Sequence, residues 1–297
     1  MKIAVTGASG LIGTALVTHL HSAGHEVVRL VRRPPRAPDE VIWDPERGTV
    51  DLARLGGVDG AVHLAGAGVG DHRWTDAYKR TIRDSRVLGT RTLVTALTSL
   101  DPLPRVLVLG SAVGFYGNRG EEVLTEESEG GSGFLADVVR AWEAETRPAE
   151  DAGIRVARAR SGLVLAGEGG AAGRLLPLVR LGLGGPLGNG RQWWPWITLE
   201  DEVRALTYLL QQEDLSGPVN LSAPEPARNR DVVKALGGAV HRPAVLPAPA
   251  VALRLALGEF AGSILDSQRV VPQRLLAAGF SFRHPTLTEA AAWVTST

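Results

Sequence analysis

The sequence contains no cysteine, which excludes disulfide bonds, iron–sulfur clusters, thiolate zinc sites and cysteine-based catalysis. It also has no excess of charge, because 32 basic residues balance 32 acidic ones and the pI is about 7.1. Nucleic acids and anionic membranes select strongly basic surfaces, so we expect neither as a partner. No apolar run reaches the roughly 18 residues that a membrane-spanning helix needs.

Signals for export and for metal binding are also missing. The first apolar strand is predicted to begin at residue 2, which leaves no room for a signal peptide, so we expect a soluble cytoplasmic protein. The seven histidines show no spacing typical of metal ligands, and we expect no metal site. Lysine is so rare that 29 of the 32 basic residues are arginine, so a single arginine carries little information.

What the sequence does contain is a glycine-rich turn near its start. Residues 5–13 read Val-Thr-Gly-Ala-Ser-Gly-Leu-Ile-Gly, after an apolar strand and at the beginning of a periodic apolar helix. The first glycine allows a sharp turn, the second lets backbone N–H groups approach a phosphate, and the third lets the helix pack closely on the sheet. Together with the positive end of the helix dipole, this pattern predicts a pyrophosphate site. Its predicted binding residues are Thr6, Gly7, Ser9, Gly10, Leu11, Ile12 and Gly13.

Apolar strands alternate with helical segments over the first 160 or so residues, which predicts an α/β fold with a doubly wound parallel sheet of the Rossmann type. Right-handed crossovers bring the carboxyl ends of such strands to one edge, so ligand-binding residues should lie in the turns that follow them. The expected strands lie near residues 2–6, 26–31, 41–43, 60–64, 105–110 and 154–160, and the expected helices near 11–23, 75–99 and 134–151.

Beyond about residue 165 the sequence becomes rich in glycine and proline, which predicts a smaller, irregular C-terminal lobe. We assign residues 1–170 to a nucleotide-binding domain and residues 171–297 to a lobe that covers the substrate. A helix near 201–213, which Asp201 is expected to cap or begin, and a strand at 219–221 indicate that the segment 197–223 returns to the first domain. The acidic loop 121–129 is interpreted as a solvated face, with a metal site as the alternative.

The end of the second predicted strand indicates which coenzyme the glycine turn binds. NAD-binding units usually place Asp or Glu there, where the carboxylate accepts hydrogen bonds from the ribose hydroxyls. Here the strand ends in Arg32 and Arg33. A guanidinium group binds a 2′-phosphate through parallel charged hydrogen bonds, so the sequence favours NADP(H). The alternative is a solvated basic pair.

Three motifs together resemble the extended short-chain dehydrogenase/reductase superfamily: the turn at residues 6–13, His63-Leu-Ala-Gly66 and Ser111-x-x-x-x-Tyr-Gly117. The chain is more similar still to an atypical branch, the NAD(P)-dependent epimerase family with a C-terminal domain of unknown function. The motifs of that branch include Arg83-Asp-Ser-Arg86, Trp142-Glu143, Arg160-Ser-Gly-Leu-Val-Leu165 and Trp194-Pro-Trp-Ile197. The resemblance covers almost the whole chain. It implies the C-terminal domain at residues 243–293 and allows a homodimer through the helices near 75–99 and 134–151.

The resemblance also implies further coenzyme contacts. Leu64, Ala65 and Gly66 follow the fourth predicted strand, where small residues let the adenine-ribose half of the coenzyme lie against the backbone. Arg86 lies on the long helix that faces the same edge, and the resemblance implies that it reaches the coenzyme. The alternative for Arg86 is an ion pair with Asp84 or Glu143.

Conventional members of the superfamily transfer hydride with a Tyr-x-x-x-Lys pair, in which the lysine lowers the pKa of the tyrosine. The sequence lacks this pair, and by position Phe134 and Val138 take its two places. Ser111 remains at the end of the fifth predicted strand, and we predict that it orients a substrate oxygen. Tyr116 is the predicted replacement acid/base, and the alternative for Tyr116 is a purely structural ring packed under its turn.

The segment Gln192-Trp-Trp-Pro-Trp-Ile197 is unusually rich in aromatic rings. These rings either form a wall beside a flat or apolar substrate or fasten the smaller lobe to the sheet. Our leading hypothesis is an NADP(H)-dependent oxidoreductase or epimerase-like enzyme with an unknown small-molecule substrate. The alternative, which the missing Tyr/Lys pair keeps open, is a non-catalytic NADP(H)-binding sensor or scaffold.

Overall fold

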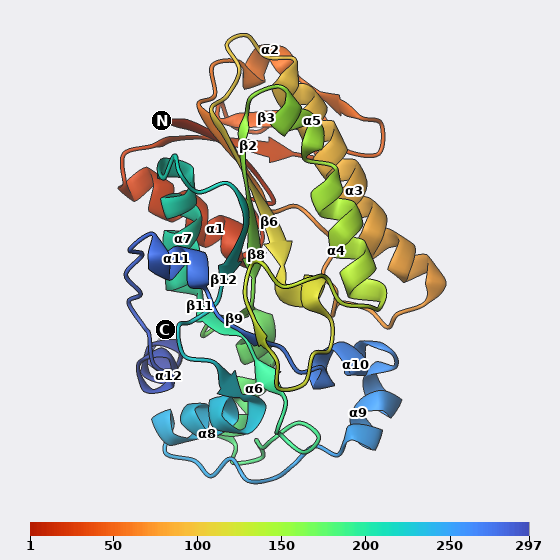
Figure 1. The fold of residues 1–297 in the computed structure, drawn as a ribbon, viewed down its shortest axis with the longest axis vertical. Helices are drawn as coiled ribbons and strands as arrows, with labels where there is room; N and C mark the ends of the chain where they lie inside the picture. The colour runs from red at the N-terminus through yellow and green to blue at the C-terminus, as the bar shows by residue number, and fades with distance from the viewer. Residues whose placement is uncertain (297) are drawn as a thin grey trace.

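An eight-stranded sheet forms the centre of the computed structural model, which describes residues 1–296 apart from the side chains at 171, 172 and 174 (Figure 1). The strand order is β12-β8-β6-β5-β1-β2-β3-β4, in which β4 alone runs antiparallel to its neighbour. Because β5 and β2 flank β1, the strand order reverses at β1, and in sheets of this kind the ligand-binding crevice lies outside the carboxyl ends of the strands at that point. The bounds are β1 (Lys2–Thr6), β2 (Glu26–Val31), β3 (Glu40–Asp44), β4 (Thr49–Val50), β5 (Gly60–His63), β6 (Val106–Ala112), β8 (Arg155–Ser161) and β12 (Gly217–Leu221).

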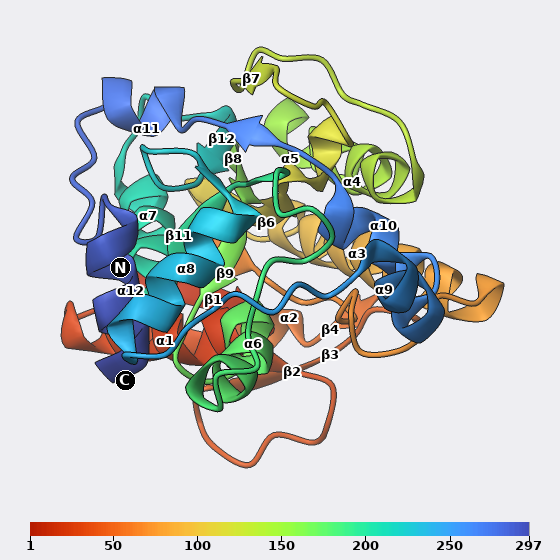
Figure 2. The ribbon, with the colours of Figure 1, turned by 90° about the horizontal axis from the view of Figure 1, so that it is seen from below.

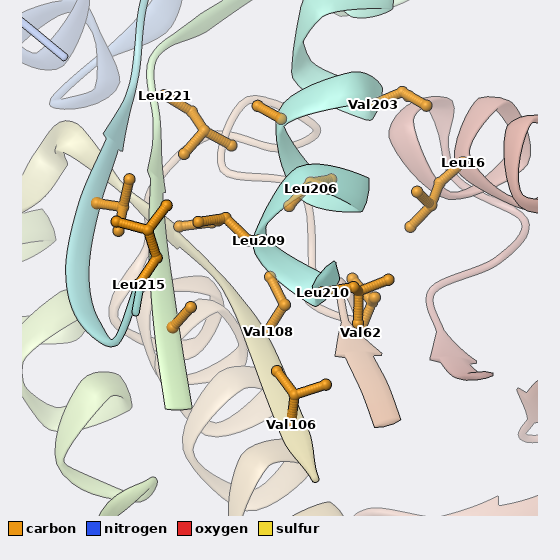
Figure 3. Packing of buried hydrophobic residues seen from close by; sticks show 14 of the residues in the cluster. Leu16, Val62, Val106, Val108, Val203, Leu206, Leu209, Leu210, Leu215 and Leu221 are labelled. Atoms are coloured by element: carbon orange, nitrogen blue, oxygen red, sulfur yellow. The ribbon is translucent and has the colours of Figure 1, made fainter. Parts of the chain in front are cut away.

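Helices cover both faces of the sheet (Figure 1). On one face lie α1 (Leu11–Ser22), α7 (Leu199–Gln211) and α11 (Gln273–Ala277); on the other lie α3 (Asp76–Thr98), α4 (Phe134–Ala144) and α5 (Arg147–Asp151), with α2 (Leu52–Leu55) at the β3 end. Successive strand residues point to opposite faces, so Ile3 and Val5 pack with α1 and α7, whereas Ala4 packs with α3. Figure 3 shows the first of these cores, where Leu206 and Leu209 of α7 meet Val108 of β6.

The segment after β8 returns to the sheet. Strand β12 pairs parallel with β8, and α7 packs against α1, as expected for the segment 197–223. The short strands β9 (Leu163–Leu165) and β11 (Trp196–Thr198) pair beside the sheet. The irregular lobe that follows lies beyond the carboxyl ends of the strands (Figures 1 and 2). Its elements are α6 (Gly170–Arg180), β10 (Trp193–Trp194), β13 (Ala227–Arg228), α8 (Asn229–Ala239), α9 (Ala250–Leu257), α10 (Phe260–Leu265) and α12 (Leu287–Ser296).

The helices and strands of the structure differ from the expected ones in two places. The single helix expected near 134–151 is divided into α4 and α5, because Pro148 has no N–H group to continue the ladder and instead lies in the first turn of α5. The hairpin strand β4 and the short helix α2 were not foreseen, since neither contains a periodic apolar run. None of the described helices is long and apolar enough to cross a membrane.

The acidic loop is not uniformly solvated. Its strand β7 (Val123–Leu124) pairs with β14 (Arg269–Val270), which joins the loop to the C-terminal lobe. Glu126 is buried and accepts hydrogen bonds from the backbone N–H groups of Asn220 at 3.0 Å and Arg274 at 3.2 Å. The interpretation as a solvated face is therefore wrong for Glu126, because two segments distant in sequence supply its donors.

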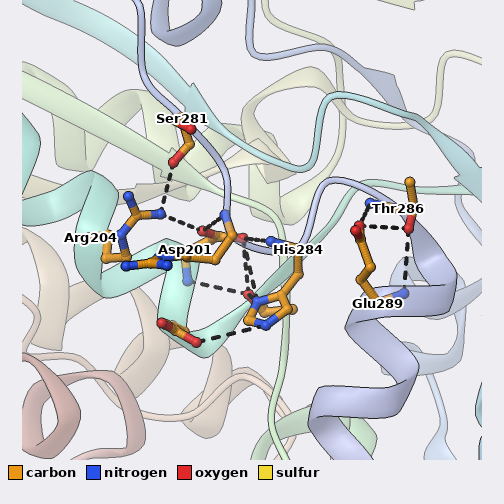
Figure 4. A network of polar contacts seen from close by, with 9 residues as sticks. Asp201, Arg204, Ser281, His284, Thr286 and Glu289 are labelled. Atoms are coloured by element: carbon orange, nitrogen blue, oxygen red, sulfur yellow. Dashed lines mark hydrogen bonds and ion pairs between the residues drawn. The ribbon is translucent and has the colours of Figure 1, made fainter.

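Asp201 lies in the first turn of α7, but it does not cap the helix. Thr198 does so, because its hydroxyl accepts a hydrogen bond from the N–H of Asp201 at 3.2 Å. Asp201 is buried and accepts hydrogen bonds from the backbone N–H groups of Arg283 at 2.7 Å and His284 at 2.9 Å, and from Arg204 at 3.0 Å (Figure 4). Asp201 therefore fastens the segment before α12 to α7, which packs on the central sheet.

Candidate functional site

The glycine turn between β1 and α1 has the geometry that the sequence predicts. Gly7 has a φ of +67°, and a Cβ there would lie 2.7 Å from the carbonyl carbon of Leu64. A Cβ on Gly13 would lie 2.1 Å from the carbonyl oxygen of Gly7, so only glycine lets α1 approach so closely. Ser9 and Gly10 are exposed, and Gly10 precedes α1 without a side-chain cap. The first N–H groups of α1 are therefore open to an anion, and a pyrophosphate fits this turn.

The loop that follows β9 lies over the start of α1. Leu11 and Ile12 are half-buried there. A Cβ on Gly169 would lie 3.4 Å from a methyl group of Leu11, and one on Gly170 would lie 3.1 Å away. The loop after β9 thus approaches the glycine turn from the side of the C-terminal lobe.

Thr6 joins the end of β1 to the loop that follows β5. Thr6 is fully buried, and its Oγ1 lies 2.6 Å from Nδ1 of His63. The same oxygen accepts hydrogen bonds from the N–H groups of Leu64 at 3.1 Å and Ala65 at 3.2 Å. Burial lowers the pKa of His63 to about 3, so this ring is neutral. Thr6 therefore positions the predicted coenzyme loop, in which Gly66 is exposed.

The two predicted phosphate ligands lie in different environments. Arg33 donates hydrogen bonds to both carboxylate oxygens of Glu40, at 2.7 and 2.8 Å, and these bonds lower the pKa of Glu40 to about 2. Arg32 is exposed and forms no hydrogen bond or ion pair with any residue that the structure describes. Arg32 is therefore the guanidinium group open to a phosphate, whereas Arg33 fixes the loop that follows β2.

Arg86 lies on α3 beneath the loop that follows β5. Its Nη1 donates hydrogen bonds to the carbonyl oxygens of Ala67 at 2.9 Å and Ile82 at 3.0 Å. Its guanidinium carbon lies 5.2 Å from the centre of the Trp142 ring. Burial lowers the pKa of Arg86 to about 10.

The ion pair considered as an alternative for Arg86 does not form. Asp84 lies beside Arg83, and Glu143 is bound by Arg160 instead. Within residues 1–296 no carboxylate forms an ion pair with Arg86, apart from the undescribed side chains. This alternative was wrong because helical spacing places Asp84 away from Arg86, on another side of α3.

Ser111 belongs to a buried ion-pair network. Its Oγ donates a hydrogen bond to Oε1 of Glu143 at 2.6 Å, and Arg160 donates to both oxygens of that carboxylate at 2.9 and 2.8 Å. Ser111 and Arg160 are each 4% exposed and Glu143 is 8% exposed. Because its hydrogen is committed to Glu143, the Ser111 hydroxyl has only acceptor capacity left. Its predicted role toward a substrate stays a prediction.

Tyr116 joins the same network through Arg160. Its hydroxyl donates a hydrogen bond to Oδ1 of Asn220 at 2.7 Å and accepts one from Nη1 of Arg160 at 3.2 Å. Tyr116 is fully buried, and burial raises the pKa of its hydroxyl. A buried hydroxyl with two protein partners has no open path to a substrate, so the geometry favours the structural alternative for Tyr116.

Apolar side chains occupy the two helix positions of the missing Tyr-x-x-x-Lys pair. Val138 is buried, and Phe134 packs edge-on against Trp74 with ring centres 5.0 Å apart. Trp74 in turn contacts Phe260 of α10, with ring centres 5.6 Å apart. The C-terminal lobe thus completes an aromatic cluster at the place where a catalytic tyrosine would lie.

The tryptophan-rich segment fastens the lobe. Trp194 and Trp196 lie in the core of the C-terminal lobe, and Nε1 of Trp194 donates a hydrogen bond to the carbonyl of Ile264 at 3.1 Å. The neighbouring Trp193 is half-buried between the guanidinium groups of Arg228 and Arg269, at 4.4 and 4.8 Å. The fastening alternative therefore describes Trp194 and Trp196 better than a substrate wall.

Glu202 was missed by sequence reasoning. It is fully buried on α7, where one oxygen accepts a hydrogen bond from Ser161 and the other has no partner among the described residues. Burial raises the pKa of Glu202 to about 7. The available signal was its helical spacing to Leu206 and Leu209, which places Glu202 on the apolar face of α7.

Among the described residues, no group of three or more His, Asp or Glu side chains is arranged to hold a metal ion.

Comparisons with known proteins place the chain in a family. The NAD dependent epimerase/dehydratase family model matches residues 3–222, and a domain of unknown function matches residues 248–294, close to the expected 243–293. An epimerase family protein of Mycobacterium bovis is 46% identical over 295 residues, which cover 99% of this chain and 97% of the relative.

Solved structures agree with this assignment. The human epimerase family protein SDR39U1, determined with NADPH, has a TM-score of 0.93 and 35% identity, covering 100% of this chain and 99% of its own. A nucleoside-diphosphate sugar epimerase from Corynebacterium glutamicum has a TM-score of 0.82 and 38% identity, covering 99% of this chain and 58% of its own. The chain therefore belongs to the NAD dependent epimerase/dehydratase family, as an atypical short-chain dehydrogenase/reductase with a Rossmann-type NAD(P)-binding fold.

Proposed function

We propose that the protein is an NADP(H)-dependent oxidoreductase or epimerase-like enzyme that acts on a small-molecule substrate. The observation that carries this proposal is Arg32 at the end of β2, an exposed guanidinium group with no partner among the residues that the structure describes. It follows the strand next to β1, whose glycine turn is shaped for a pyrophosphate. The NADPH bound to the human relative supports the same coenzyme. Bound NADP(H) would supply or accept the hydride.

Calorimetric titration with NADPH and NADH tests the coenzyme assignment. We expect the wild-type protein to bind NADPH at least about tenfold more tightly, because a charged hydrogen-bonded contact contributes roughly 1.5–3 kcal/mol. Arg32→Gln should remove this preference. Arg47→Gln is the matched control, because Arg47 is 83% exposed on the β3–β4 hairpin and should leave the preference unchanged. Equal affinities in the wild type, or a preference that survives Arg32→Gln, would refute the assignment.

Turnover requires a second assay. Purified protein is incubated with NADPH and a panel of carbonyl compounds, and oxidation is followed by the absorbance of the reduced nicotinamide. Epimerisation restores the coenzyme at the end of each cycle, so nucleotide sugars incubated with NADP⁺ are analysed by chromatography. New product in either arm supports an enzyme.

A non-catalytic NADP(H) sensor or scaffold is the second candidate. The observation that favours it is the state of the expected proton donors: the Ser111 hydrogen is committed to Glu143, and Tyr116 is buried. Phe134 and Val138 supply no replacement. Tight NADPH binding without product in any arm would favour this candidate over the enzyme.

We further infer a cytoplasmic protein that forms a homodimer through α3 and α4. The support is the family resemblance, in which these helices form the usual dimer surface. Light scattering of the purified protein should give twice the chain mass of 31.4 kDa. A monomer at micromolar concentration would refute the dimer, and recovery in a membrane or organelle fraction would refute the location.

A further inference from the structure

The loop that follows β5 connects the glycine turn with Arg86. Its first residue, Leu64, is so close to both neighbouring strands that a Cβ on Gly7 or on Gly110 would come within 2.7 Å of it. Two residues later, a Cβ on Gly66 would lie 3.1 Å from the guanidinium carbon of Arg86. Arg86 therefore lies on the β5 and β6 side of the crevice, whereas Arg32 lies on the β2 side.

This arrangement assigns the two arginines to different halves of the coenzyme. In a doubly wound sheet, a dinucleotide crosses the point where the strand order reverses, and its pyrophosphate lies over the first strand. If Arg32 holds the 2′-phosphate of the adenosine half, the nicotinamide half extends toward β5 and β6. Residues 64–66, which we expect beside the adenine-ribose half, then lie between the two halves, and Arg86, behind them on α3, lies on the nicotinamide side.

Arg86 also reaches the helix face from which the missing lysine would project. Val138, at the place of that lysine, and Trp142 are four residues apart on α4, so their side chains share one face. The Arg86 guanidinium lies over the Trp142 ring. The charge of Glu143, the next residue of α4, is balanced by its ion pair with Arg160. Glu143 therefore does not balance the charge of Arg86.

We propose that Arg86 replaces the missing lysine as the cation beside the nicotinamide half and makes the protein favour the reduced coenzyme. The inference rests on the proposed function. The nicotinamide ring is positively charged in NADP⁺ and neutral in NADPH, so a fixed cation nearby disfavours only the oxidised form. At a separation of roughly 10 Å and an effective dielectric constant of about 20, two like charges change the affinity ratio by about tenfold.

The test compares dissociation constants, so no substrate is needed. Calorimetry on the full-length protein gives the ratio of Kd for NADP⁺ to Kd for NADPH, which we expect to be about ten in the wild type. Arg86→Gln should bring this ratio close to one, and Arg86→Lys, which keeps the charge, should preserve it. Arg83→Gln is the matched control, because Arg83 lies on the same helix with an exposed side chain.

A third ligand distinguishes the two halves. Adenosine 2′,5′-bisphosphate lacks the nicotinamide, so Arg86→Gln should leave its affinity unchanged, whereas Arg32→Gln should weaken it. If the wild type binds neither this probe nor NADPH, the proposed function fails. If it binds both probes but shows a ratio near one, or if folded Arg86→Gln keeps the ratio, only the role of Arg86 fails. If Arg86→Gln does not fold, the role of Arg86 is refuted by a wild-type ratio near one and supported by a ratio near ten that Arg86→Lys preserves.

Discussion

Glu202 provides the sharpest test of the buried electrostatics, because the residue is 0% exposed and one of its carboxyl oxygens has no hydrogen-bond partner in the described part of the chain. Glu202→Gln keeps the shape of the side chain and removes the titratable proton. The pKa of Glu202 is raised from 4.5 to about 7 in the folded state, mainly by burial. Between these two values the folded protein holds a proton that the unfolded chain has released.

The sign and size of the effect follow from this difference. Because the folded state binds more protons than the unfolded state, the contribution of Glu202 to stability is fully present below pH 4.5 and is lost as the pH rises through 7. At about 1.4 kcal/mol per pH unit, the loss amounts to about 3 kcal/mol. The wild type should therefore match Glu202→Gln near pH 4.5 and be about 3 kcal/mol less stable than the variant at pH 8.

Urea denaturation across this pH range measures the difference. His63, whose pKa burial lowers to about 3, also makes stability depend on pH, but it does so in both proteins and cancels. The exposed Glu213 at the end of α7 gives the matched control Glu213→Gln, which should show no such trend. A difference between wild type and Glu202→Gln that stays constant with pH would refute the reasoning.

Three further predictions concern the glycine turn, the buried network and the C-terminal attachment. Gly10→Ala should keep its folding stability within about 1 kcal/mol, because an added Cβ would meet only the carbonyl oxygen of Gly7, at 3.4 Å. It should weaken NADPH binding at least about tenfold in calorimetry, because a Cβ hinders the approach of a phosphate to the backbone N–H groups of this turn. Gly13→Ala should instead destabilise the fold itself in a thermal melt, because its Cβ would lie 2.1 Å from the same oxygen. Tyr116→Phe should lower the free energy of unfolding by about 1–3 kcal/mol, because it leaves two buried hydrogen-bonding groups without a partner, while NADPH affinity stays unchanged in calorimetry. Asp201→Ala should cost about 2 kcal/mol and expose the segment before α12 to limited proteolysis, since two partly buried backbone N–H groups, of Arg283 and His284, lose their acceptor.

The shape of the glycine turn can be predicted from the sequence because its geometry is local. Gly7, Gly10 and Gly13 act through their own backbone and their immediate neighbours, so spacing and residue type suffice. The sequence does not show that Arg33 is held by a carboxylate whereas Arg32 is not. It depends on Glu40, which the parallel pairing of β2 with β3 brings beside Arg33.

The buried network shows why the catalytic assignments were harder. Ser111 and Glu143 are 32 residues apart in sequence, and Tyr116 and Asn220 are 104 residues apart. No local pattern reveals that Arg160 will neutralise the carboxylate and also contact the tyrosine. The local sequence of a turn does not show whether distant segments bury it. The sequence alone therefore leaves both the catalytic and the structural role of Tyr116 open.

The C-terminal domain is part of the support of that turn. Asn220, which accepts the Tyr116 hydrogen bond, donates through Nδ2 to the carbonyl of Val271 at 3.1 Å. Gln268 donates to the carbonyls of Val113 and Gly117, on either side of Tyr116, at 3.2 and 3.0 Å. In place of the conventional proton shuttle, this chain has a network that extends from the sheet into residues 268–271. The turn that carries Tyr116 and follows Ser111 therefore cannot shift without disturbing these bonds, which couples the end of β6 to the C-terminal domain.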